Sequence, residues 1–458
     1  MTALQEYLTG LRGRSVAVIG AGVSNMPLIG LLRGAGVDVT VHDRKSAEEL
    51  GGQHGALASL GVSLELGGHY LDHLPEDVIF RTPGVHPNHP SLCAARARGS
   101  LVTSEMELFF ELCPCPVIGV TGSDGKTTTT TLVYEILTHA GHTVHLGGNI
   151  GKPLLPELDS IAPDHLAVVE LSSFQLMDMR RSPQVAAITN LSPNHLDYHG
   201  SFAEYVEAKT AIYRFQKASD RLVLDWDDPV THKLALPQGA QVSWTSKQSV
   251  PENGVYLRSD GMICILENGC SCELLPQSEI RIPGAHNVYN LMMAAALVQG
   301  RASNDDIRAV AREFNGVEHR IELVREKDGV RYYNDSIASS PTRTIAGLKS
   351  FPEKLILIAG GYDKNLDYSV LGEHISEHVK TLVLTGTTAP KIRACIEQYD
   401  GPHPKILDAA SLEDAVRLAA SVAQTGDVVL LSPASASFDC FKNFMERGNR
   451  FKALVHAL

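Results

Sequence analysis

The sequence has no long apolar run. No segment provides the roughly 20 consecutive apolar residues that a membrane-spanning helix requires. The first residues, MTALQEYLTGLRGR, lack the apolar stretch and the cleavage site of a signal peptide. We therefore expect a cytoplasmic protein without a membrane partner.

Basic residues are in the minority, since 40 lysines and arginines stand against 52 acidic residues and give a formal net charge of −12. A negative chain repels nucleic acid and anionic membranes, although a local basic cleft can still bind a small anion. We therefore expect no nucleic-acid partner. Separately from the charge, the chain is expected to act on small-molecule substrates and to be a monomer.

Cysteine is also sparse, with eight residues in 458. This number is too small for a disulfide framework, and cytoplasmic thiols stay reduced. The two close pairs, Cys113 with Cys115 and Cys270 with Cys272, have one intervening residue, whereas common zinc sites have two. We expect ordinary thiols at these positions.

The chain is long and rich in apolar residues, with 44% hydrophobic residues and 39 glycines. Domains of about 100–200 residues suggest two to four of them. We expect three α/β domains, over residues 1–104, 105–316 and 317–458.

Alternating β-rich and helical stretches support this division. Strands are expected at residues 15–20, 37–43, 115–122, 165–171, 184–190, 354–361, 381–386 and 426–435, and helices at 25–34, 128–141 and 286–300. The turn-rich residues 251–283 are expected to interrupt the second sheet as an antiparallel insertion.

The strongest motif is Gly122-Ser-Asp-Gly125-Lys126-Thr127, between a predicted strand and a predicted helix. Its glycines let backbone N–H groups approach phosphate oxygens at the positive end of the helix. Lys126 would neutralise phosphate charge, and Thr127 would hold magnesium. A standard P-loop has glycine where this chain has Val120, so the motif is a shortened variant. The alternative is a glycine-rich turn with an exposed lysine.

A second turn, Gly20-Ala-Gly22-Val-Ser-Asn25, follows the first predicted strand, and Asp43 ends the next strand. This pattern suits a nucleotide-diphosphate site, but ordinary tight packing between strand and helix remains open because Asn25 replaces the third glycine. No nicotinamide cofactor is expected. Glu170 and His195 are candidate metal ligands, although such residues are more often exposed and hydrogen-bonded.

Several motifs occur together and in one order: TGSDGKTT, GGNIG, VELSSFQL, NLSPNHLDYHGSFAEYVEAKTAIY, GAHNVYN, VEHRIE, NDSIASSPT, GGYDKNLDY and LLSPASASFDCFKNFMERG. In this respect nearly the whole chain resembles the Mur ligases. The short first domain and the closing LLSPASASFDCFKNF are most similar to members that add D-glutamate to UDP-N-acetylmuramoyl-L-alanine.

The resemblance implies a Rossmann-like domain for the UDP substrate, a central P-loop ATPase-type domain and a Rossmann-like domain for the amino acid. It implies an ATP-dependent ligase of peptidoglycan precursor synthesis, which activates a carboxylate as an acyl phosphate. Closure of the third domain onto ATP is part of this expectation.

The family pattern also assigns residues. The UDP substrate is expected at Gly20, Asp43, Arg44, Thr82, Asn149 and His195. ATP is expected at Gly122, Ser123, Asp124, Gly125, Lys126, Thr127, Thr128, Asn287, Asn290, Arg320 and Asp335, and D-glutamate at Ser339, Lys364, Ser437 and Phe444. The expected catalytic set is Lys126, Glu170, His195, Lys209, Arg320 and Asp335.

Two magnesium ions are implied, held by Thr127, Glu170, His195 and Lys209. Lys209 matches a lysine that the family carries as a carbamate, which turns a cation into an anionic ligand. His319, beside Arg320, is equally compatible with a packing role.

The chain departs from the family at Ile337, where relatives often have lysine, and at Ser339, where threonine is common. Isoleucine cannot replace a positive charge, so Lys364 or Lys442 is a candidate substitute. Other steps of the same family and folylpolyglutamate-type ligases remain open, although the latter resemble only the last two domains. A P-loop switch that hydrolyses ATP without forming an amide is the alternative from another class.

Overall fold

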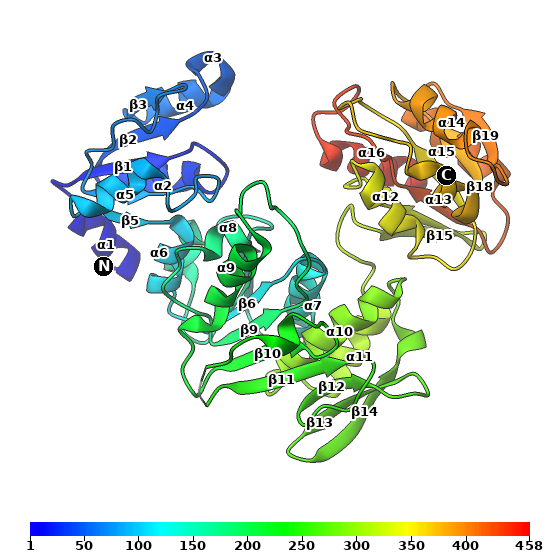
Figure 1. The fold of residues 1–458 in the computed structure, drawn as a ribbon, viewed down its shortest axis with the longest axis horizontal. Coiled ribbons are helices and arrows are strands. Elements are labelled where there is room, and N and C mark those ends of the chain that lie inside the picture. The colour runs from blue at the N-terminus through cyan, green and yellow to red at the C-terminus, as the bar shows by residue number, and fades with distance from the viewer. Residues whose placement is uncertain (238) are drawn as a thin grey trace. The chain divides into compact units, whose positions relative to one another are not determined.

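Three β-sheets flanked by helices follow one another along the chain (Figure 1). The structure is a computed structural model and describes residues 1–237 and 239–458. Two compact units are distinguished: unit 1 contains residues 1–277 and 289–310, and unit 2 contains residues 278–288 and 311–458. The expected α/β class is confirmed, whereas the boundaries near residues 104 and 316 remain predictions.

The first sheet is entirely parallel, with strand order β3-β2-β1-β4-β5. Its region comprises α1 (Ala3–Gly10), β1 (Ser15–Ile19), α2 (Asn25–Gly34), β2 (Asp38–Asp43), α3 (Ala47–Leu50), α4 (Gly52–Ser59), β3 (Ser63–Leu66), β4 (Val78–Phe80), α5 (Pro90–Ala97) and β5 (Leu101–Thr103). The strand order reverses at β1, and ligands of such sheets bind beyond the carboxyl ends of the strands at the reversal.

The second sheet has the order β14-β13-β12-β11-β10-β9-β6-β8-β7. Its first part comprises α6 (Glu105–Leu112), β6 (Val117–Thr121), α7 (Lys126–His139), β7 (Val144–Gly148), the 3₁₀ helix η1 (Leu155–Ser160), β8 (Leu166–Glu170), α8 (Ser173–Leu176), β9 (Val185–Ile188) and α9 (Phe202–Arg214). Strands β6 and β8 are buried along their whole length, because helices cover parallel strands on both faces.

The rest of this region comprises β10 (Arg221–Asp225), η2 (Thr231–Lys233), β11 (Gln241–Ser246), β12 (Gly254–Leu257), β13 (Met262–Glu267), β14 (Cys270–Pro276), η3 (Gln277–Glu279), α10 (Ala285–Val298) and α11 (Asn304–Glu313). Strand β12 still pairs in parallel with β11, and only the pairings of β13 with β12 and with β14 are antiparallel. The expected antiparallel pairing is confirmed for this segment, whereas the expected interruption of the sheet is wrong. The turn-rich strands extend one edge of the sheet, where a hairpin can pair without a crossover.

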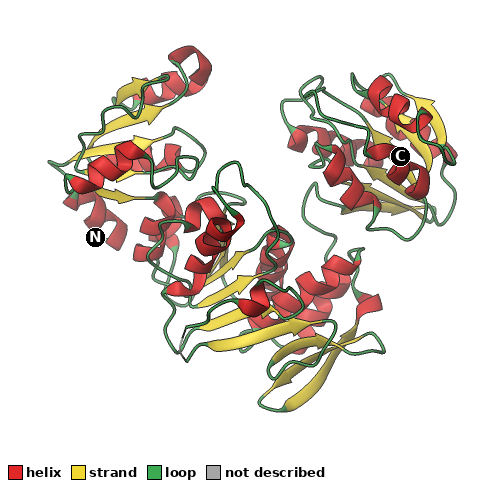
Figure 2. Cartoon of the chain, viewed as in Figure 1, coloured by secondary structure: helices red, strands yellow, loops and turns green. Residues whose placement is uncertain are grey.

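The third sheet has the order β15-β16-β20-β17-β18-β19, in which only β15 is antiparallel. Its region comprises β15 (Glu322–Lys327), β16 (Val330–Asn334), α12 (Pro341–Leu348), β17 (Leu355–Ala359), α13 (Leu371–His378), β18 (Val379–Leu384), α14 (Ala389–Glu397), β19 (Lys405–Asp408), α15 (Leu412–Val422), β20 (Val428–Leu431) and α16 (Phe444–Ala457). Helices lie on both sides of these strands (Figure 2), and two apolar clusters fill the two faces.

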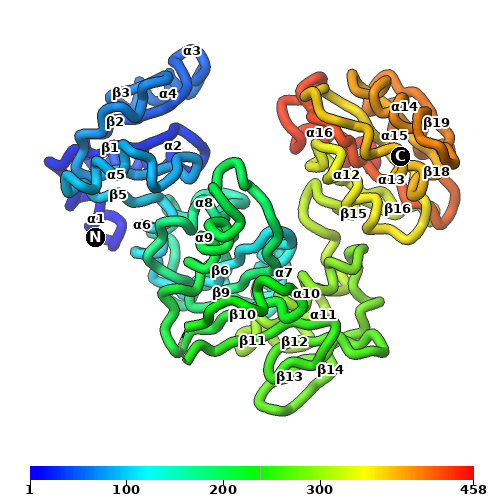
Figure 3. The backbone as a smooth tube through the Cα atoms, viewed as in Figure 1, coloured from blue at the N-terminus to red at the C-terminus, as the bar shows by residue number. Residues whose placement is uncertain are grey.

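The colour gradient of Figure 3 shows that the chain completes each sheet region before it enters the next. Within unit 1, α2 packs against η1, and one apolar core includes residues of both the first and the second sheet region. Within residues 1–237 and 239–458, no helix combines the length and apolarity needed to span a bilayer.

Candidate active site

The loop between β6 and α7 has the geometry of a phosphate-binding loop. Gly125 caps α7 in the left-handed conformation, with φ of 78°, and a Cβ there would lie 2.4 Å from Asn290 Oδ1. A Cβ on Gly122 would lie 1.9 Å from Thr189 Oγ1. Glycine is therefore required at both positions. The standard P-loop has a further glycine where this chain has Val120, so the loop is a shortened variant. The positive end of α7 lies at this loop, where an anion can bind.

The residues between the two glycines are anchored by the segment that follows β9. The Ser123 N–H donates to Asn190 O over 2.9 Å, and the Asp124 N–H donates to Asn190 Oδ1 over 3.0 Å. The Ser123 hydroxyl also lies 2.9 Å from the Tyr205 hydroxyl. Thr128 is buried in the first turn of α7. The loop is thus held in place by residues far along the chain.

Thr127 and Glu170 meet at the carboxyl ends of the strands. The Thr127 hydroxyl donates to Glu170 Oε2 over 2.7 Å, and Asn149 Nδ2 donates to Glu170 Oε1 over 2.8 Å. Asn149, which was expected to contact the UDP substrate, therefore lies beside Glu170. Lys126 Nζ donates to Ser123 O over 2.8 Å, which folds the lysine back over the loop.

Hard oxygen donors of this kind suit magnesium. The Thr127 hydroxyl and the Glu170 carboxylate are close enough for one small cation to bind both, and Glu170 is only 1% exposed. These residues fit the expected first magnesium site.

Lys209 is buried, with 2% of its surface exposed, and projects from α9. Its Nζ donates to Thr121 Oγ1 over 3.1 Å and lies 4.8 Å from the centre of the Tyr205 ring. No residue of the described ranges forms a salt bridge with it. Burial, followed by the charge of Lys126, holds the pKa of Lys209 well below its usual value, although Glu170 and Asp124 act in the opposite direction.

His195 is exposed and adopts a left-handed backbone conformation, with φ of 53°. Its ring packs edge-on against Phe174, with 4.9 Å between the ring centres. Partial burial lowers its pKa, and the positive charges of Lys126 and Lys209 act in the same direction, against Asp197. His195 therefore lies within the electrostatic reach of both lysines.

The two predicted adenine-site asparagines both lie on α10 and are both buried. Asn290 Oδ1 accepts a hydrogen bond from Thr129 over 3.4 Å and lies against Gly125. Asn287 Nδ2 donates to Pro283 O over 2.6 Å. Asn290 is thus a neighbour of the phosphate loop within unit 1.

Three of the four UDP residues expected in the first sheet region meet at the reversal of strand order. Gly20 follows β1, and its hydrogen points at Thr82, whose Cβ would be 3.2 Å from a Cβ on Gly20. Asp43 accepts hydrogen bonds from the Ala21 N–H over 2.8 Å and the Lys45 N–H over 2.9 Å. The fourth, Arg44, is exposed at the end of β2.

In unit 2, Arg320 and Asp335 interact electrostatically. Asp335 is buried and accepts a hydrogen bond from the Ser432 hydroxyl over 2.8 Å. Burial raises its pKa to about 7, although the Ser432 hydrogen bond and the Arg320 charge lower it. The roles of both residues toward ATP remain predictions.

The expected D-glutamate residues lie on several loops of unit 2. Lys364 Nζ stands 5.0 Å from the centre of the Phe438 ring, and Ser437 is buried. Phe444 begins α16, and its ring meets His319 edge-on at 6.0 Å. Ser339 and Ile337 are half-buried, with the Ser339 N–H donating to Ile337 O over 2.8 Å.

His319 has the surroundings of a packing residue. It is 4% exposed, its Nδ1 lies 2.9 Å from Asn334 Nδ2, and Gly448 leaves room for its ring. Lys442, the other candidate for a compensating charge, is exposed.

The burial of two arginines, Arg81 and Arg447, was not predicted from the sequence. Arg81 precedes Thr82 and binds Asp178 Oδ1 over 2.5 Å, so that it joins the first sheet to the segment after α8. Arg447 of α16 donates to Ser336 Oγ, Ser336 O, Ala436 O and Ser435 O over 2.9–3.1 Å. Burial lowers its pKa to about 10. Their burial has no local sequence signal, since arginine is normally exposed.

Comparison with known proteins agrees with this arrangement. The family described as Mur ligase middle domain matches residues 120–298, and the one described as Mur ligase, glutamate ligase domain matches residues 319–435. The chain is 50% identical over 463 residues to the UDP-N-acetylmuramoylalanine--D-glutamate ligase of Acetivibrio thermocellus, covering 100% of this chain and 99% of that protein. It is 46% identical to the ligase of the same name from Ruminiclostridium cellulolyticum, covering 99% of both.

Solved structures show the same fold at low sequence identity. UDP-N-acetylmuramate-alanine ligase MurC from Thermotoga maritima is 18% identical, with a TM-score of 0.58 over 97% of this chain and 99% of that chain. MurF ligase from the same organism, in complex with ADP, is 18% identical, with a TM-score of 0.57 over 100% of both chains.

The fold and the phosphate loop define a nucleotide-binding α/β protein of the P-loop class. The chain belongs to the Mur ligase family, as the full-length identity of 50% shows. The family resemblance stated from the motifs is confirmed.

Proposed function

We propose that the chain is an ATP-dependent ligase that joins D-glutamate to UDP-N-acetylmuramoyl-L-alanine in peptidoglycan precursor synthesis. The observation that carries the proposal is the meeting of the Gly122–Gly125 loop, the Thr127–Glu170 pair and buried Lys209 in unit 1. The name shared by the relatives, at 44–50% identity, supports the choice of substrates.

The reaction needs an activated carboxylate, because an amine cannot expel an oxide from a carboxylate. Transfer of the ATP γ-phosphoryl group to the alanyl carboxylate releases ADP and forms an acyl phosphate. The D-glutamate amine then attacks the carbonyl carbon, and phosphate leaves with the electron pair of the C–O bond. Lys126 and the N–H groups at the start of α7 stabilise charge on the phosphoryl oxygens, so no covalent enzyme intermediate is required.

Thr127 and Glu170 would hold a magnesium ion at the phosphates. When bound, the ion would neutralise phosphate charge and favour attack by the carboxylate oxygen. Asn149 holds the Glu170 carboxylate in place through its hydrogen bond of 2.8 Å, which is the usual way in which a ligand is oriented.

Lys209 is the proposed carbamate. An uncharged amine adds to carbon dioxide to give a carbamate and a proton, and a buried lysine without a salt bridge within the described residues favours the uncharged amine. The carbamate oxygens would then join His195 at a second magnesium ion. As an ammonium group, Lys209 could not bind a metal.

The first sheet supplies the proposed UDP site. Gly20 and Thr82 lie at the reversal of strand order, and Asp43 organises the turn through the Ala21 N–H. In unit 2, Lys364, Ser437, Ser339 and Phe444 are the proposed D-glutamate residues. Lys364 would pair with a carboxylate in place of the charge that Ile337 cannot supply.

The experiment measures phosphate release from ATP with magnesium and UDP-N-acetylmuramoyl-L-alanine. D-glutamate, L-glutamate, L-alanine or meso-diaminopimelate is added in separate reactions, and the product mass is determined. Release with D-glutamate alone, with the mass of the amide product, is the expected outcome. Release with another amino acid would move the chain to another ligase step, and release without any amino acid would refute ligation.

A further inference from the structure

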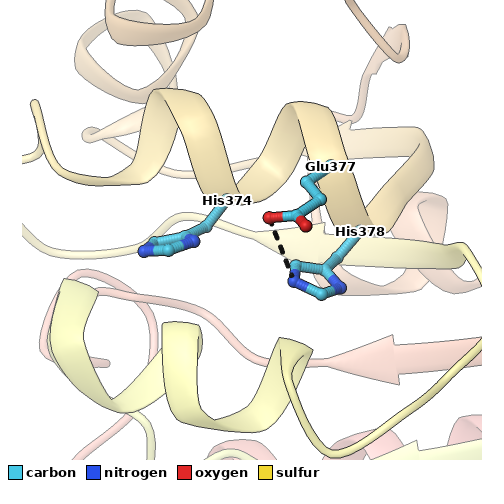
Figure 4. A group of neighbouring side chains, drawn as sticks. All are labelled: His374, Glu377 and His378. Atoms are coloured by element: carbon cyan, nitrogen blue, oxygen red, sulfur yellow. Dashed lines mark ion pairs between the residues drawn. The ribbon is translucent and has the colours of Figure 1, made fainter.

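Helix α13 of unit 2 carries a cluster that the ligase reaction does not use. His374, Glu377 and His378 each offer one ligand atom, and these atoms all lie within 4.8 Å of one another. In Figure 4 the three side chains lie on one side of the helix, and the Glu377 carboxylate lies between the two imidazole rings. None of the three belongs to the proposed ATP, UDP or D-glutamate sites.

The spacing explains why the side chains converge. Residues three and four apart on an α-helix share a face, so Glu377 and His378 both follow His374 by one turn. Two histidines with this spacing and an acidic residue beside the second one form the order His-x-x-Glu-His, which zinc-binding helices use with the two histidines as metal ligands. No site residue expected from the sequence falls within this motif.

Two further observations point to a cation. His374 Nδ1 is buried and has no hydrogen-bond partner within the described residues, so a metal ion would supply its missing partner. The cluster also occupies the last turn of α13, where the helix carboxyl end carries partial negative charge. Glu377 Oε2 lies 3.6 Å from His378 Nε2, close to the spacing of two ligands on one ion.

The ligand set decides the class of metal. Two imidazoles and one carboxylate suit zinc and neighbouring first-row ions, whereas magnesium prefers oxygen ligands alone. Bonds of about 2.0–2.2 Å to zinc require the ligand atoms to approach one another slightly. Glu377 is exposed and His374 and His378 are half-buried, so rotation of their side chains can close the remaining distance.

One positive charge lies near the cluster. Lys354 Nζ donates to Ser376 O over 3.3 Å, on the backbone of the same helix. Lys354 is exposed, so solvent screens its repulsion of a bound ion.

We propose that His374, Glu377 and His378 form a binding site for one divalent transition-metal ion of the zinc class on the surface of unit 2. The protein supplies three ligands, and solvent completes the coordination. Binding links two successive turns of α13 and stabilises this helix where it leads directly into β18.

The test is a titration of the full chain with Zn²⁺ in excess Mg²⁺, followed with a competing chromophoric chelator. The wild-type protein is expected to bind one equivalent more than the double variant His374→Ala/His378→Ala. Glu377→Gln should weaken this equivalent about 10–100-fold, at least as much as loss of a residue that only supports a ligand. Zn²⁺ should also raise the melting temperature of the wild-type protein more than that of the double variant.

His69→Ala is the matched control. His69 is exposed and lies 2.7 Å from Asp72, so it pairs one imidazole with one carboxylate but lacks a second histidine. This variant should bind as many equivalents as the wild-type protein. If the double variant does not fold, His374→Gln/His378→Gln replaces it. An unchanged number of equivalents and an unchanged affinity in the folded double variant would overturn the proposal.

Discussion

Lys209 Nζ donates a hydrogen bond to the Thr121 hydroxyl over 3.1 Å. Thr121 ends β6, and its hydroxyl donates to Leu171 O over 2.6 Å, just beyond β8. Lys209 is therefore anchored at the edge where both strands end and where the phosphate loop begins. Its chemical state bears directly on the charge of the ATP site.

Lys209→Ala should abolish ligase activity, because the proposed carbamate and its negative charge are lost. The shortened side chain also leaves a cavity that a small carboxylate can fill. Addition of formate or acetate should therefore restore part of the phosphate release that depends on D-glutamate. The measurement is this release with increasing concentrations of carboxylate.

Lys209→Arg is the control for this rescue. Arginine keeps a positive charge, fills the space and forms no carbamate, so added carboxylate should have no effect. Equal activity of wild-type protein and Lys209→Arg would contradict the proposed carbamate.

Thr127→Val should raise the Mg²⁺ concentration needed for half-maximal activity. Valine has a similar shape but lacks the hydroxyl that lies 2.7 Å from Glu170 Oε2. We expect a rise of about 10–100-fold, as for residues that support metal sites. Thr131→Val is the control. Thr131 lies one turn after Thr127 on α7, its hydroxyl donates to Thr127 O, and it has no proposed ligand role. A similar Mg²⁺ requirement for both variants would argue against Thr127 as a ligand.

Arg447→Ala should destabilise unit 2 by about 3 kcal/mol, because buried carbonyl oxygens and a hydroxyl lose their donors. Arg450→Ala on the same helix should cost at most about 1 kcal/mol, since its ion pair with Glu413 is half-exposed. Hydrogen exchange of strands β16, β17 and β20 measures both effects. Similar exchange rates in the two variants would show that the hydrogen bonds of Arg447 to Ser336, Ser435 and Ala436 do not stabilise these strands.

Glu105 should make the stability of unit 1 depend on pH. Its carboxyl is buried, with Oε1 unpartnered within the described residues, and burial raises its pKa from 4.5 to about 7, against a hydrogen bond from the Leu155 backbone. Between these two values the folded state binds more protons than the unfolded state. The free energy of unfolding therefore falls as pH rises through this range, by about 3 kcal/mol in all.

Glu105→Gln should remove this fall. The free energy of unfolding of the variant should therefore increase relative to that of the wild-type protein as pH rises from about 4.5 to about 7. Urea unfolding at several pH values measures the difference. Glu48→Gln removes an exposed carboxylate and serves as the control. A constant difference between wild type and Glu105→Gln across this pH range would refute the assignment.

Local patterns were sufficient for most of the fold. The predicted strand at residues 165–171 is β8, and the helix predicted to end at Gly141 is α7, which stops at His139. Strand and helix periods depend on neighbouring residues, so they can be read along the chain. The hairpin of β13 and β14 was wrongly predicted to interrupt the sheet, because its place depends on where the rest of the sheet ends.

The candidate site was likewise predictable from the sequence only in part. The Gly122–Thr127 motif was recognisable because its glycines, lysine and hydroxyl are adjacent in the chain. The burial of Lys209 was not, because its partner Thr121 lies 88 residues away. Arg447 likewise holds Ser336, which is 111 residues distant. Residue types and their short spacings identified the family and the phosphate loop, whereas burial, and with it the charge state of each side chain, depended on contacts that only the folded chain creates.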